Sequence, residues 1–155
     1  MESRTTLGKV AMYVTRGCLI VPVQLELHDD VLLQMQEDIL ENVNKTGVRG
    51  VIIDVSGVAI MDSFIAQAIL DTAKMASLLG ARTVITGIRP GVAAALIDLG
   101  FKFENVLTAI SLEEGFRLME PVLASEDEYE EVAERNVEEE DETTEDENAE
   151  EQEQE

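Results

Sequence analysis

The pair of residues most able to do chemistry in this chain is Asp62-Ser63, in the segment AIMDSFIA at residues 59–66, where apolar residues lie on both sides. A serine hydroxyl acts as a nucleophile when a histidine activates it, or accepts a phosphoryl group from a kinase. An aspartate before a helical run is also a common N-cap. The sequence therefore offers three roles for this pair: nucleophile, phosphoacceptor and helix start.

The remaining reactive side chains do not form a recognisable catalytic or metal site. His28 is the single histidine, and it precedes Asp29 and Asp30. This group lacks the convergent spacing of metal ligands and is better explained as a solvated cap, which we assign to Asp29 or Asp30. A dyad of Ser63 and His28 would need a third group to hold the imidazole, and none is apparent. Without a P-loop, a G-x-G-x-x-G or a G-x-S-x-G motif, the chain is predicted to be no enzyme and to hold no cofactor.

Charge divides the chain in two. Residues 126–155 hold 18 of the 33 acidic residues and one basic residue, whereas residues 1–125 have a net charge of only −5. A segment so charged and so poor in apolar residues cannot offset its ordering entropy. We therefore predict a folded domain at 1–125 and an acidic disordered tail at 126–155. The mild charge of the folded part predicts no nucleic-acid partner, and the tail would repel one.

Three features predict a cytoplasmic protein that does not insert into a membrane. No run reaches the roughly 18 apolar residues of a membrane helix, and the N-terminal residues lack the pattern of a signal peptide. The single cysteine, Cys18, lies in an apolar run. It is predicted to be a buried structural thiol, which fits a reducing compartment.

Apolar periodicity predicts an α/β fold. Strands that alternate with helices imply a mostly parallel sheet with right-handed crossovers, and the first two runs flank a short glycine-containing link typical of an antiparallel hairpin. The sheet is accordingly mixed, with about four helices. The predicted elements are strands at 9–14 and 18–23, a helix at 29–46, a strand at 51–55, a helix at 63–79, a strand at 83–86, a helix at 90–98, a strand at 105–108 and a helix at 111–123.

This order places Ser63 in the first turn of a helix that follows a buried strand, at the edge where parallel sheets present functional groups. Met61, Phe64 and Ile65 cannot all point inward together with the core positions further along the helix. Apolar surface is therefore expected around Ser63. Met61, Asp62, Phe64 and Ile65 are predicted partner-binding residues, and a phosphate on Ser63 would spoil such an interface.

The combined sequence pattern resembles the STAS-domain family of anti-sigma-factor antagonists over roughly residues 8–120. Within that family it is most similar to the small scaffold proteins of the stressosome. The residues that carry the resemblance are VIIDVSGVAIMDSFIAQAIL at 51–70, TVITGIRPGVAAALIDLG at 83–100, LIVPVQLELHDD at 19–30, MQEDILENV at 35–43 and DSFIA at 62–66.

The resemblance implies a STAS fold and a protein that is a scaffold rather than an enzyme. It implies self-association and a large cytoplasmic assembly with sensory STAS paralogues. It also implies that the scaffold sequesters a switch-type serine kinase, is phosphorylated by it on Ser63 and then releases it, and that a phosphatase resets the system. The acidic tail departs from the family pattern, and we interpret it as a solubilising appendage, with partner binding as the alternative.

Three other functions remain open for the sequence. The first is a simple binary antagonist of an anti-sigma kinase, regulated by serine phosphorylation without a large assembly. The second is a module that binds a nucleotide or small anion near Ser63. The third is a serine hydrolase.

Overall fold

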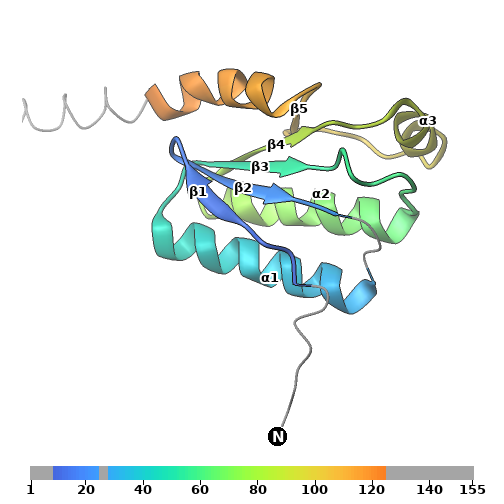
Figure 1. Cartoon of the computed structure of the whole chain (residues 1–155), viewed down its shortest axis with the longest axis horizontal. Helices are drawn as coiled ribbons and strands as arrows, with labels where there is room; N and C mark the ends of the chain where they lie inside the picture. Colours follow the sequence, from blue (N-terminus) through green and yellow to red (C-terminus); the bar gives the residue numbers. More distant parts are fainter. Residues whose placement is uncertain (1–8, 25–27, 125–155) are drawn as a thin grey trace, which may run out of the picture. The chain divides into compact units, whose positions relative to one another are not determined.

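We describe the fold from a computed structural model, which describes residues 9–24 and 28–124 of the chain (Figure 1). This part holds a five-stranded sheet and four helices. In chain order the elements are β1 (Tyr13–Thr15), β2 (Cys18–Pro22), α1 (Asp29–Thr46), β3 (Gly50–Asp54), α2 (Ser63–Leu78), β4 (Arg82–Thr86), α3 (Pro90–Asp98), β5 (Leu107–Ala109) and an unlabelled last helix at 112–124. The predicted tail at 126–155 lies outside the described residues.

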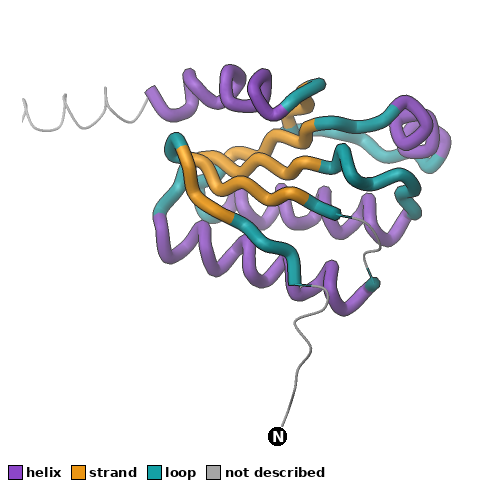
Figure 2. The backbone as a smooth tube through the Cα atoms, viewed as in Figure 1, coloured by secondary structure: helices purple, strands orange, loops and turns teal. Residues whose placement is uncertain are grey.

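The strands are ordered β1-β2-β3-β4-β5 across the sheet. β1 pairs with β2 antiparallel, and each later pair is parallel. Figures 1 and 2 show α1 and α2 on one face of the sheet and the last helix on the other. The predicted mixed sheet with an N-terminal antiparallel hairpin is confirmed.

The face of the sheet under α1 and α2 carries the main apolar core. Leu19 and Val21 of β2 point to this face together with Val51 and Ile53 of β3, and all four are buried. α1 covers them with its predicted stripe, since Leu32, Met35, Ile39 and Val43 are all buried. Strands buried on both faces need such continuous apolar runs.

The face of the sheet opposite α1 and α2 is also buried, because the last helix packs closely against it. A Cβ atom at Gly115 would lie 2.9 Å from Cγ2 of Thr86, so only glycine lets the helix backbone lie so near the sheet. Cys18 points to this face and is fully buried. Burial raises the pKa of its thiol, which makes it an inert core residue as predicted.

Helix starts follow the sequence expectation with one correction. Ser111 caps the last helix: its Oγ accepts from the backbone N–H of Glu114 at 3.2 Å, while the Glu114 carboxylate accepts from the N–H of Ile110 at 3.1 Å. For α1, however, the cap prediction was wrong. His28 is the N-cap and makes no side-chain cap bond, while Asp29 and Asp30 lie in the first turn. There they stabilise the helix through its dipole instead of through a cap.

Two strands are shorter than predicted. Residues 9–12 do not pair with β2, because Val10 and Met12 pack against the core instead and the amide of Asn42 donates to the sulfur of Met12. At the other edge β5 begins only at Leu107, because Asn105 has a positive φ of 65° that no strand accommodates.

No helix in the described part of the chain is long and apolar enough to cross a membrane.

The buried stripe of α1 should contribute more to the stability of the fold than the exposed face of the same helix. We expect Ile39→Ala to lower the free energy of unfolding by about 3 kcal/mol. The Ile39 side chain is 0% exposed, so its truncation leaves a cavity in the core. Leu33→Ala is the matched control on the same helix, where the side chain is 49% exposed. It should cost less than about 1 kcal/mol. Urea denaturation measures both, and equal losses would contradict this assignment of faces.

Candidate functional site

The candidate site lies where β3 ends and α2 begins. α1, α2 and α3 each follow a strand of the parallel part of the sheet, so all three helices begin at its C-terminal edge (Figure 1). A loop at residues 55–62 leads from β3 to α2 at this edge. It carries the segment around Ser63 that the sequence singles out.

Asp62 is the N-cap of α2, as the sequence predicts. It has extended backbone angles, and its Oδ1 accepts from the N–H of Ile65 at 2.8 Å. Its carbonyl oxygen accepts from the N–H of Ala66 at 3.1 Å. These two bonds fix the first turn of the helix, so Ser63 becomes the first helical residue, with an exposed side chain.

Two large apolar side chains close to Ser63 in the sequence are exposed. Ile60, at the end of the loop, is 83% exposed, and Phe64, in the first turn, is 43% exposed. Ile60 and Phe64 flank Ser63 in the sequence, which makes them candidates for the apolar surface expected around it. We call Ile60, Ser63 and Phe64 the docking surface from here on, as the name of the site at which partner binding is proposed below.

The other predicted partner-binding residues are placed differently. Met61 is only 7% exposed and lines a small apolar cavity together with Ala66, Ile88 and Leu96. Ile65 is half-buried and packs against the core. Met61 is therefore buried rather than exposed as expected, while the adjacent Ile60 is exposed. Which of these residues contact a partner stays a prediction.

The sequence contains a signal that Met61 is buried and Ile60 exposed. Met61 precedes the cap and Ala66 is the fourth helical residue, and both line the same cavity. A contact between these two positions is a hydrophobic staple, which fixes how the chain enters a helix. A staple draws the residue before the cap inward, so the next apolar residue back, Ile60, remains outside.

The site shows no geometry for hydrolysis or metal binding. In the described residues, no hydrogen bond joins the Ser63 hydroxyl to His28, which lies exposed before α1. Nor does any group of three His, Cys, Asp or Glu side chains there have the geometry of a metal site. What the arrangement offers is a free hydroxyl at a helix start. The unsatisfied N–H groups and helix dipole at such a start favour an added negative charge.

Comparison with known proteins places this geometry in a family. The family model of the STAS domain matches residues 9–115. The RsbT co-antagonist protein RsbRD of Bacillus subtilis (strain 168) is 33% identical over 124 residues, which make up 77% of this chain and 45% of that protein. The chain thus spans under half the length of this curated relative.

Two solved structures share both fold and sequence with the chain. A serine-to-glutamate variant of RsbS from Moorella thermoacetica superposes with a TM-score of 0.67 at 27% identity, over 74% of this chain and 97% of that one. A chain from the stressosome, described as a signal integration and transduction hub, superposes with a TM-score of 0.65 at 28% identity, over 73% and 98% of the two chains. The chain belongs to the STAS domain family.

Proposed function

We propose that this chain is a stress-signalling scaffold of the stressosome type, which holds a serine kinase at its docking surface and releases it when Ser63 is phosphorylated. The observation that carries the proposal is the position of Ser63: an exposed hydroxyl at the first residue of α2, between exposed Ile60 and Phe64. The similarity to RsbS and to a stressosome chain supports the assembly. The name of RsbRD as a co-antagonist of RsbT supports a protein partner.

Phosphorylation at this place changes the surface without breaking the fold. A phosphoserine carries about two negative charges at neutral pH. At the start of α2 those charges lie against the positive end of the helix dipole, which favours them. The carboxylate of the N-cap Asp62, next to Ser63, opposes the added charge. The dipole and the unsatisfied N–H groups offset this repulsion in our proposal, so the helix start stays formed. A partner that buries Ile60 and Phe64 would have to desolvate the phosphate, which is costly.

The proposal assigns the chain a binding role and no catalytic one. Its partners are the kinase, sensory STAS paralogues that assemble with it, further copies of itself and a phosphatase that restores the free hydroxyl. All of these partners act in the cytoplasm, where the chain would also be located. The proposal includes no cofactor, because the phosphate's charge and size alone would distinguish the phosphorylated from the unphosphorylated surface.

Ser63 should be the phosphoacceptor. After incubation with the cognate kinase and ATP, we expect the intact mass of the full chain to rise by one phosphoryl group, because Ser63 is exposed and followed by a stable helix. Ser63→Ala is the control and should gain no mass. Wild-type protein that stays unmodified, or a Ser63→Ala variant that gains the same mass, would contradict the proposal.

Ile60 should contribute to kinase binding. We expect Ile60→Ser to weaken the complex by at least about tenfold, because burial of an isoleucine contributes about 1.5–3 kcal/mol. Isothermal titration calorimetry with the unphosphorylated chain measures the change.

The control for this experiment is Ile97→Ser on α3, where the side chain is 71% exposed and equally available for substitution. It lies outside the docking surface and should bind like wild type. If the two variants bound equally well, the docking surface would be assigned to the wrong residues.

A further inference from the structure

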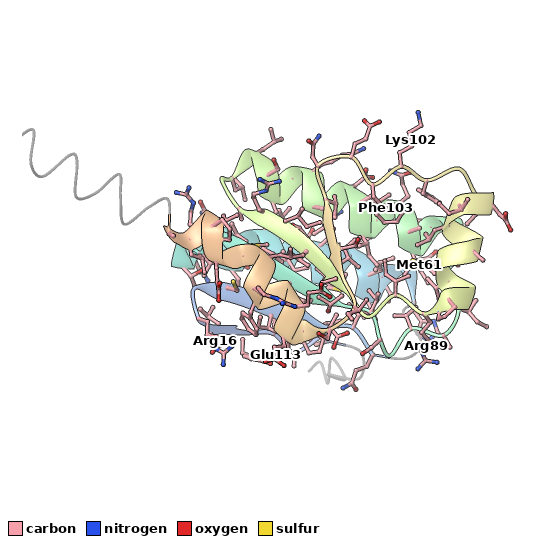
Figure 3. The ribbon with its side chains drawn as sticks, turned by 90° about the horizontal axis from the view of Figure 1, so that it is seen from above. Arg16, Met61, Arg89, Lys102, Phe103 and Glu113 are labelled. Carbon is pink, nitrogen blue, oxygen red and sulfur yellow. The ribbon has the colours of Figure 1, made fainter. Side chains whose placement is uncertain are left out.

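Arg89 reaches from the start of α3 to the loop that leads to Ser63. It is the N-cap of α3, but its side chain makes no cap bond. Instead its Nε donates to the carbonyl oxygen of Ser56 at 2.9 Å, between residues 33 apart in the chain. Figure 3 shows Arg89 and Met61 at the same end of the sheet, beside α3. The bond thus joins the loop after β3 to the loop after β4.

Ser56 is held from two further directions. Its N–H donates to Oδ1 of Asp54 at 3.0 Å. Gly87 lies directly against it: a Cβ atom at Gly87 would lie 2.8 Å from Cβ of Ser56 and 3.0 Å from Oδ1 of Asp54. Gly87 also has a φ of +75°, which disfavours any other residue. The backbone of residues 87–89 is therefore shaped to receive Ser56.

The other end of the loop rests on the same segment. Met61 lines its apolar cavity with Ile88, the residue between Gly87 and Arg89. Between the two contacts only Val58 is well buried, and its N–H donates to the carbonyl of Val55. Ile60 has no such support and projects outward. Residues 87–89 therefore hold both ends of the stretch that carries Ile60, and Ser63 follows two residues after Met61.

We infer that Arg89 is a positioning residue for the docking surface: its bond to Ser56 keeps the loop at 55–62 in the one conformation that presents Ile60 and Ser63 together. That the surface binds a kinase rests on the proposed function. That Arg89 holds the loop is independent of the proposed function. Loss of this bond leaves the loop its own turn bonds but removes the side-chain link between Ser56 and the segment after β4, so open conformations of the loop become more populated.

The test compares Arg89→Met with Arg82→Met in the full chain. Methionine keeps length and apolar stem but cannot donate a hydrogen bond. Arg82 is exposed, lies at the opposite end of β4 and loses the same charge, so it controls for electrostatics. We expect the N–H groups of Ser56 and Val58 to exchange with deuterium about fivefold faster in Arg89→Met. Exchange in α1 and in Arg82→Met should stay as in wild type, and Arg89→Lys should recover part of the protection.

Phosphorylation kinetics then test the consequence for Ser63. We expect Arg89→Met to raise the KM of the cognate kinase, with kcat unchanged, by the factor by which the fraction of chains with the competent loop falls. Unchanged exchange at Ser56 and Val58 would overturn the inference, as would a KM that does not follow the open fraction that exchange gives for each variant. A wild-type chain that the kinase does not phosphorylate contradicts the proposed function instead, while the exchange experiment still decides whether Arg89 holds the loop.

Discussion

The arrangement of the molecule depends on one constraint: parallel strands have to be covered by helices on both faces. β2, β3 and β4 pair in parallel, so the chain must return to the start of each next strand through a helix. This return brings the starts of α1, α2 and α3 to one edge of the sheet (Figure 1). The opposite ends of the helices lie away from it. The loops that lead into these three helices therefore lie together at the edge where the helices start.

Within that edge, short-range bonds decide what is presented. The carboxylate of Asp62 sets the first residue of α2, which makes Ser63 a surface residue on a rigid element. Burial of Met61 then leaves Ile60 outside. In the proposed function, phosphorylation of this hydroxyl would change the charge of the surface and leave its backbone in place. The residues that would switch the surface are exposed and thus differ from the buried residues that stabilise the fold.

Local rules predict the elements well, because each depends on neighbours in the sequence. The stripe of α1, the hairpin and the cap at Asp62 all follow from spacing within a few residues. The burial of Met61 and the exposure of Ile60 were missed, because the apolar pattern alone does not say which of two adjacent apolar residues packs inward. The position of Met61 before the cap, with Ala66 lining the same cavity, is the placement of a hydrophobic staple and accounts for it. The bond from Arg89 to Ser56 spans 33 residues, so only the folded sheet brings its partners together.

The central claim is that one charged group on Ser63 closes the docking surface to the kinase. Its most direct test is the affinity of the cognate kinase for two forms of the full chain, one unmodified and one with phosphoserine incorporated at position 63 during synthesis. Calorimetry should give a Kd for the phosphorylated form at least about tenfold higher, with equal thermal stability of the two forms. Equal affinity for both forms would contradict the claim, and so would tighter binding of the phosphorylated form.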